Sequence, residues 1–145
     1  MIAKVIENKE ALAPVLVLLQ SSKLPFQDIT LEGNLFMSYQ DEAGNLIGSG
    51  GLELYGPYSL IRSIAVDEKQ RGKSLGKQIV EDIIQQARSR SLKEIYLLTE
   101  TAHDFFIHIG FKDVSRDLVP DAVKASPEFI SVCPVSAACM VYHLQ

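Results

Sequence analysis

The spacing of hydrophobic positions changes several times along the chain, and each spacing predicts a different element. Apolar residues recur at helical spacing between Leu12 and Leu19, which predicts a helix over Lys9 to Gln20 capped by Asn8. A second helical stripe predicts a helix over Ser74 to Arg90. Short apolar runs typical of strands cover Ile2 to Ile6, Leu35 to Tyr39, Leu46 to Tyr55, Ser59 to Val66, Glu94 to Leu98, Phe111 to Val114 and Ala137 to Leu144.

Turn residues and two shorter helices complete the predicted order. The acidic segment Asp41 to Asn45 contains a glycine and joins two strand-like runs, which predicts a hairpin. A helical turn is expected near Phe26 to Thr30, a helix over Thr101 to Ile109 that ends at Gly110, and another over Asp117 to Ala125. The order β-α-β-β-β-α-β-α-β, followed by a tail that contains the short helix and the strand over Ala137 to Leu144, predicts a mixed α/β sheet with one parallel βαβ step, within a single domain of residues 1–145.

Composition narrows the classes of partner. The 145 residues suit one domain with a single core, and the formal net charge of −4 comes without a basic patch. Nucleic acid is therefore not an expected partner. The apolar stretch Ala11 to Leu19 is too short to cross a bilayer, and the start Met1-Ile2-Ala3-Lys4 lacks the order of a signal peptide. These features predict a cytoplasmic protein that does not bind membranes.

The segment between the strand that ends at Val66 and the helix that follows Ser74 carries the first candidate chemistry. It contains a basic residue, Arg71, and the glycines Gly72 and Gly76. Backbone N–H groups at the start of a helix point toward an anion, and glycine lets the backbone come close to a phosphate. The segment therefore predicts a site for pyrophosphate.

Two common phosphate loops do not fit the chain. Gly72-Lys73-Ser74 matches the end of a nucleotide P-loop, but Asp67 stands where the opening glycine belongs and would repel phosphate. Gly48-Ser49-Gly50-Gly51 begins like a dinucleotide fingerprint, but Glu53 stands at the third glycine position and the segment lies in a hairpin. We interpret this glycine run as a flexible strand edge.

A third kind of loop fits better. Arg71-Gly72-Lys73-Ser74-Leu75-Gly76 resembles the acyl-CoA loop of the GNAT acetyltransferase superfamily, Gln/Arg-x-x-Gly-x-Gly/Ala, with Ser74 in place of the middle glycine. The segment Leu97 to Phe111 resembles the second GNAT signature. The resemblance covers nearly the whole chain and implies the GNAT fold, a mostly antiparallel mixed sheet with helices on both faces.

A narrower resemblance concerns three other segments. Glu53 to Gly56, Leu60 to Val66 and the tail Pro127 to Pro134 look like the small GNAT proteins encoded with arsenic-resistance genes. Those proteins in turn resemble the acetyltransferase domain of N-acetylglutamate synthases.

The GNAT resemblance implies acetyl-CoA as co-substrate, a small primary amine such as an amino acid or analogue as acceptor, no metal, and a homodimer. It places the pantetheine arm along the backbone of Ile64, Ala65 and Val66, and the pyrophosphate on the N–H groups of Arg71, Gly72, Lys73, Ser74, Leu75 and Gly76. It also implies that Thr99, Ala102 and Phe105 line the lower part of the arm.

The acceptor side contains several candidate residues. Glu53, an acid among apolar residues and glycines, is the candidate base, and the alternative is an outward-facing strand residue. Glu100 is a second candidate. Many family members protonate the leaving thiolate with a tyrosine where this chain has Phe106, so Tyr55, Ser63 or water would donate instead. A non-catalytic CoA-binding regulatory module is therefore a competing interpretation.

Arg62 and the two cysteines each leave alternatives open. Arg62 interrupts an apolar strand, and its guanidinium suits either an acceptor carboxylate or an ion pair with a nearby acid such as Glu53. We interpret Cys133 and Cys139 as two reduced thiols, and the alternatives are a disulfide or a pair that binds a soft metal or an arsenical.

Overall fold

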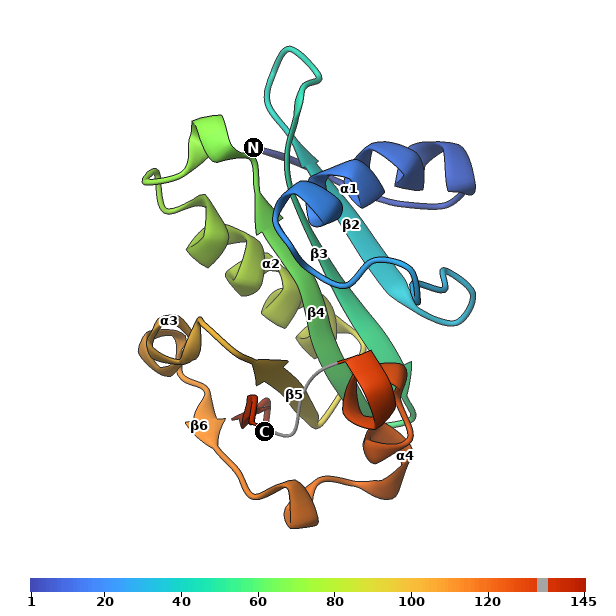
Figure 1. Cartoon of the computed structure of the whole chain (residues 1–145), viewed down its shortest axis with the longest axis vertical. Helices are drawn as coiled ribbons and strands as arrows, with labels where there is room; N and C mark the ends of the chain where they lie inside the picture. The colour runs from blue at the N-terminus through green and yellow to red at the C-terminus, as the bar shows by residue number, and fades with distance from the viewer. Residues whose placement is uncertain (133–135) are drawn as a thin grey trace. The chain divides into compact units, whose positions relative to one another are not determined.

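The computed structural model describes residues 1–132 and 136–145. Figure 1 shows its strands and helices. In chain order they are β1 (Ile2–Val5), α1 (Lys9–Ser21), β2 (Leu35–Gln40), β3 (Leu46–Tyr55), β4 (Tyr58–Val66), α2 (Leu75–Ser89), β5 (Glu94–Thr99), α3 (His103–Ile109), β6 (Lys112–Asp113), α4 (Asp121–Lys124) and β7 (Ala138–His143). Single turns of 3-10 helix cover Glu68–Gln70 and Arg116–Leu118, and a π-helical turn covers Glu128–Val132.

The strands are hydrogen-bonded in the order β1-β2-β3-β4-β5-β7-β6. β4 and β5 run parallel, with Tyr58 opposite Glu94, and the pairs β1–β2, β2–β3, β5–β7 and β6–β7 are antiparallel. The prediction of a mixed sheet with one parallel βαβ step is therefore confirmed, because α2 is the crossover between the two parallel strands.

By its contacts the chain divides into two compact units. The first consists of Met1–Glu53 and Ile61–Ile83, and the second of Leu54–Leu60 and Ile84–Gln145. Strands β3 and β4 and helix α2 contribute residues to both units. That residues 1–145 form a single domain stays a prediction.

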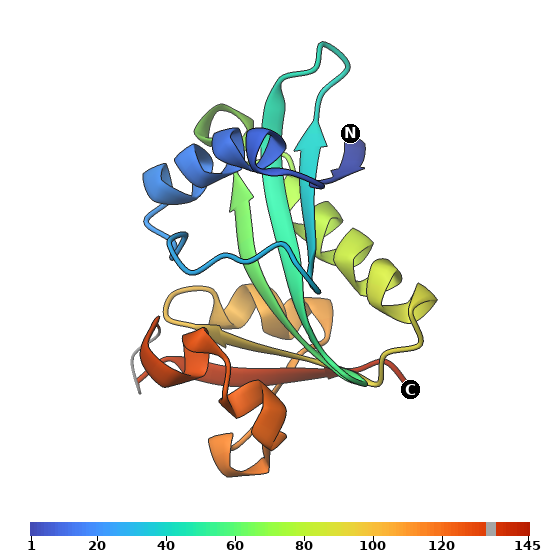
Figure 2. The same ribbon diagram turned by 90° about the vertical axis from the view of Figure 1, so that its right-hand side faces the viewer.

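In the first unit, α1 and α2 lie on opposite faces of the strands β2, β3 and β4 (Figure 2). The side chain of Asn8 accepts a hydrogen bond of 2.8 Å from the backbone N–H of Ala11, so the predicted N-cap is confirmed. The face of α1 that carries the predicted stripe is buried. The core on this side consists of Ile6, Leu12, Val15, Leu18, Leu19, Phe36 and Ala65.

The glycine run of β3 is not a flexible strand edge, and that interpretation was wrong. β3 lies between β2 and β4 in the sheet, and its glycines are buried. A Cβ at Gly48 would lie 2.5 Å from Ile79 Cδ1, and one at Gly51 would lie 2.4 Å from the ring of Phe36. These residues are glycines because side chains of α2 and β2 pack directly against the backbone of β3.

In the second unit, β7 lies between β5 and β6 in the sheet, and β6 is the edge strand. Its core consists of Leu60, Tyr96, Val119, Val123, Cys139 and Val141. Helix α3 ends at Gly110, as predicted, and the φ of Gly110 is 124°. The predicted helix over Asp117 to Ala125 is wrong, because Pro120 separates a 3-10 turn from the four-residue α4.

Candidate functional site

A buried arginine is the centre of a cluster of polar groups in the first unit. Arg62 on β4 bonds two carboxylates, those of Asp28 and Glu53, at N–O distances of 2.5 and 3.2 Å from Nη1. Its Nη2 donates to the other oxygen of Asp28 at 2.8 Å and to the backbone carbonyl of Pro25 at 3.3 Å. Nε donates to the hydroxyl of Ser63 at 3.2 Å. Glu53, Arg62 and Ser63, all predicted site residues, are thus brought together.

The members of this cluster differ in exposure. The side chains of Arg62 and Glu53 are 1% and 4% exposed, whereas that of Asp28 is 17% exposed. Hydrogen bonds from the guanidinium of Arg62 lower the pKa of Asp28 below its usual range, against the opposing effect of burial. Of the two alternatives for Arg62, the ion pair is therefore present, and Glu53 is buried rather than outward-facing.

Sequence reasoning missed Asp28, which bonds Arg62 through both of its carboxylate oxygens. Asp28 lies in a turn between α1 and β2, where only a helical turn near Phe26 to Thr30 was expected. Nothing in the local pattern points from this turn to a strand 34 residues later. Only the fold brings the two side chains together.

Ser63 occupies a backbone conformation that is uncommon in a strand. Its φ is 60°, in the left-handed region, although it lies within β4 and is buried. Its carbonyl accepts a hydrogen bond of 2.8 Å from the hydroxyl of Ser49 on β3, which holds the distorted segment. This local break in the regular strand directly follows Arg62.

The predicted phosphate loop is exposed and precedes α2. Gly72 and Ser74 have φ values of 85° and 61°, so Ser74 adopts the left-handed conformation that a glycine would adopt without strain. Arg71 Nε donates to the carbonyl of Val66 at 3.3 Å, and Lys73 Nζ donates to Gln70 at 3.2 Å. The loop therefore presents cationic side chains beside the N-terminus of a 15-residue helix.

The adjoining part of β4 has both faces in contact with protein. Ala65 belongs to the core beside α1, and Ile64 Cδ1 lies near Gly50 on β3. The side chains of Ile64 and Ala65 are therefore in contact with protein. The predicted contact of Ile64, Ala65 and Val66 with the pantetheine arm concerns their backbone instead.

Three predicted residues lie in the second unit, around the start of α3. The hydroxyl of Thr99 accepts a hydrogen bond of 3.0 Å from the N–H of Ala102, which helps to turn the chain into α3. Phe105 is 36% exposed. Phe106 is buried, and its ring lies edge-on to those of Phe105 and Phe111. Tyr55, also in this unit, packs against the core that contains Leu60.

The second candidate base, Glu100, lies exposed between β5 and α3. It differs in this respect from the buried Glu53. A substitution at Glu100 is therefore expected to disturb the fold less than one at Glu53.

A model of the acetyltransferase (GNAT) family matches residues 8–111 of the chain. The chain belongs to the GNAT family. The match includes the loop Arg71–Gly76 and the helix α3, where the sequence predicted the two GNAT signatures. The predicted family is confirmed, while the narrower resemblance to arsenic-resistance proteins stays a prediction.

Two curated relatives are similar over part of their length. The amino-acid acetyltransferase of Mycobacterium tuberculosis is 33% identical over an alignment of 99 residues, and the match covers 59% of this chain and 56% of that protein. An N-acetyltransferase of Chlorobaculum tepidum, called uncharacterized, is 28% identical over 100 residues, 68% of this chain and 62% of that protein. The matched region thus covers less than two thirds of each relative.

Solved GNAT structures resemble the chain over its full length. A Mycobacterium tuberculosis protein in complex with CoA has a TM-score of 0.79 and 20% identity, with all of both chains covered. N-acetylglutamate synthase from Neisseria gonorrhoeae, complexed with CoA and N-acetyl-glutamate, has a TM-score of 0.80 and 16% identity over all of this chain and 36% of that one. The predicted GNAT fold is confirmed.

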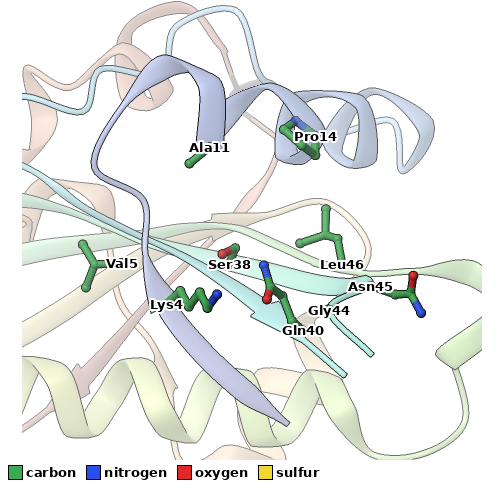
Figure 3. A pocket seen from close by; sticks show the side chains of 9 residues that line it. All are labelled: Lys4, Val5, Ala11, Pro14, Ser38, Gln40, Gly44, Asn45 and Leu46. Carbon is green, nitrogen blue, oxygen red and sulfur yellow. The ribbon is translucent and has the colours of Figure 1, made fainter. Parts of the chain in front are cut away.

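A pocket of about 490 Å³ lies elsewhere in the first unit, between α1, β1 and the β2–β3 hairpin (Figure 3). Its lining consists of Lys4, Val5, Ala11, Pro14, Ser38, Gln40, Gly44, Asn45 and Leu46. None of the predicted site residues lines it.

Cys139 is buried on β7, and burial raises the pKa of its thiol. Cys133 lies outside the described residues. The described residues contain no group of three or more His, Cys, Asp or Glu side chains placed to hold a metal ion.

Within residues 1–132 and 136–145, no helix is long and apolar enough to span a bilayer.

Proposed function

We propose that this chain transfers an acetyl group from acetyl-CoA to the primary amine of a small molecule, an amino acid or an amino-acid analogue. The observation that carries the proposal is the family match, which includes the glycine-containing loop Arg71–Gly76 before α2. The similarity to an amino-acid acetyltransferase supports the choice of acceptor.

Acetyl-CoA would be held first by its pyrophosphate. The backbone N–H groups of the segment Arg71–Gly76 and the cations Arg71 and Lys73 suit an anion at the start of α2. The N–H of Arg71 also donates to the carbonyl of Glu68, at 3.4 Å. The family pattern adds the backbone of Ile64 to Val66 for the pantetheine arm. It also adds Thr99, Ala102 and Phe105, in the second unit, for the lower part of that arm. The loop, the strand backbone and these three residues can each be tested separately.

Glu53 is the proposed base. An alkylammonium is almost fully protonated at pH 7, so its nitrogen attacks a thioester only after it loses a proton. The carboxylate of Glu53 accepts that proton, the nitrogen bonds to the acetyl carbon, and the carbon–sulfur bond breaks to release the thiolate. The second proton that the nitrogen loses in becoming an amide passes to water. The ion pair with the neighbouring Arg62 keeps the carboxylate of Glu53 in place.

Release of the CoA thiolate does not require a proton donor at position 106. A thiol has an ordinary pKa of about 8.5, so its thiolate is a fair leaving group. Tyr55, Ser63 or water is proposed as the proton donor. The phenyl ring of Phe106 cannot donate a proton.

An acceptor screen tests the proposal. Amino acids and their analogues, including arsenic-containing ones because of the narrower family resemblance, are offered with acetyl-CoA, and the released thiol is measured. Acetyl-CoA binding is measured separately by calorimetry. No binding at millimolar acetyl-CoA would refute the proposed transfer.

A second candidate, a non-catalytic module that binds CoA, is favoured by Phe106 in place of the usual tyrosine. It predicts CoA binding without thiol release for every acceptor. Thiol release that Glu53→Gln abolishes, with CoA affinity unchanged, would exclude it.

Three narrower predictions have their own tests. If Cys133 and Cys139 bind an arsenical, the double variant Cys133→Ser, Cys139→Ser should lose arsenite binding. Unchanged arsenite binding by that variant would rule this role out. The buried thiol of Cys139 argues against this binding.

The predicted homodimer is tested by measuring the mass of the protein in solution by analytical ultracentrifugation. The predicted cytoplasmic location is tested by cell fractionation.

A further inference from the structure

The hydrogen-bonding capacity of Arg62 is fully used. A guanidinium has five N–H donors, one on Nε and two on each Nη. The structure provides five contacts for them, from Ser63, Glu53, Pro25 and both oxygens of Asp28. A second carboxylate can therefore bond to Arg62 only where one of these acceptors leaves.

Asp28 has the position that a ligand carboxylate would take. Its two oxygens bond the two different Nη atoms of Arg62, the arrangement in which a guanidinium recognises a carboxylate of any origin. Its side chain is also the most exposed of the three charged side chains Asp28, Glu53 and Arg62, at 17%. A carboxylate that comes from solvent would thus meet the guanidinium where Asp28 already binds it.

Electrostatics add to this competition. Arg62 is a single positive charge between two carboxylates, those of Asp28 and Glu53. A third carboxylate placed beside them would be repelled at short range in a largely buried site. An acceptor without a carboxylate does not meet this repulsion.

We propose that Asp28 is a specificity-determining residue, an internal carboxylate that occupies Arg62 and with which any carboxylate-bearing acceptor has to compete. The acceptor part of the proposal rests on the proposed function, whereas the competition for Arg62 does not. Asp28 acts through Arg62, so it is a positioning residue rather than a catalytic one.

The competition can be tested without any acceptor. Asp28→Ala removes the internal carboxylate and is expected to lower the melting temperature, because the guanidinium loses its best partner. Sodium acetate, compared with sodium chloride at equal ionic strength, should raise the melting temperature of this variant by several degrees. The same acetate should leave the unaltered chain unchanged.

Asp82→Ala is the matched control. Asp82 accepts a hydrogen bond of 2.7 Å from the hydroxyl of Tyr39, a neutral donor that offers little to a free carboxylate. Acetate should therefore not restore the melting temperature of Asp82→Ala. If Asp28→Ala does not fold, Asp28→Ser, which retains a small polar side chain, provides the same readout.

Kinetics test the acceptor part. Alanine and alaninamide are compared in the unaltered chain and in Asp28→Ala. The KM for alanine is expected to fall at least about tenfold relative to the KM for alaninamide, because only alanine gains the vacated guanidinium. Equal changes in both KM values would mean that Asp28 has a structural role alone.

The outcomes separate the two proposals. Absence of thiol release together with acetate rescue of Asp28→Ala refutes the transfer reaction and keeps the competition for Arg62. Absence of acetate rescue overturns the competition, whatever the activity.

Discussion

At the scale of single residues, the pairing of Arg62 changes the meaning of Glu53. The sequence predicts that Glu53 is either a base or a surface charge. The structure shows that its carboxylate is buried and bonded to the guanidinium of Arg62. The ion pair holds the carboxylate of Glu53 in one position, which suits a group that has to meet an acceptor amine.

We predict that Glu53→Gln lowers kcat by roughly 10²–10⁴ and leaves acetyl-CoA affinity unchanged, because the amide cannot accept the amine proton. Steady-state thiol release and calorimetry measure the two quantities. Glu100→Gln is the matched control, since Glu100 is the other candidate and is exposed. A large loss in Glu100→Gln with full activity in Glu53→Gln would reverse the assignment.

Ser74 is a second residue with a measurable consequence. Its φ of 61° is strained for a residue with a Cβ, so Ser74→Gly is expected to raise the free energy of unfolding by up to about 1 kcal/mol. Urea denaturation measures the change. Ser91, at φ 58°, provides the control: Ser91→Gly should stabilise similarly, and only Ser74→Gly should alter acetyl-CoA affinity. A destabilised Ser74→Gly would contradict the argument.

At the scale of elements, the glycines of β3 determine how closely α2 packs on the sheet. A Cβ at Gly48 would meet Ile79 Cδ1 at 2.5 Å and the backbone carbonyl of Ala65 at 2.9 Å. We predict that Gly48→Ala lowers the free energy of unfolding by about 1–3 kcal/mol, measured by urea denaturation.

A second substitution separates the two contacts of Gly48. Ile79→Val removes the Cδ1 atom and should recover part of the loss when combined with Gly48→Ala, relative to Ile79→Val alone. The contact with the Ala65 carbonyl remains in both. Unchanged stability of Gly48→Ala would show that α2 can move away from β3.

Elements were more predictable than contacts. The cap at Asn8 and the hairpin around Asp41 follow from local patterns, and both occur where expected. Pro120 lies inside the predicted helix over Asp117 to Ala125, and in the structure it separates the 3-10 turn from α4. The partnership of Arg62 with Asp28 was not predictable, because it joins a turn and a strand that only the folded chain brings together.

At the scale of the whole molecule, the predicted acetyl-CoA residues are divided between the two units. Ile64 to Gly76 belong to the first and Thr99 to Phe105 to the second. We predict that acetyl-CoA slows amide exchange in both ranges, because ordered contacts suppress local opening. Hydrogen exchange by mass spectrometry reads each range separately, with sulfate as the control anion. Protection of Arg71 to Gly76 alone would retain the phosphate loop and remove Thr99, Ala102 and Phe105 from the site.

The position of β7 has a consequence for how the chain folds during synthesis. β7 pairs with both β5 and β6, yet it is made after both of them. Until residues 138–143 leave the ribosome, β5 and β6 each present an unpaired edge that another nascent chain can join. The second unit is therefore the part whose co-translational folding depends on its last strand, and the part for which chaperone contact during translation would matter most.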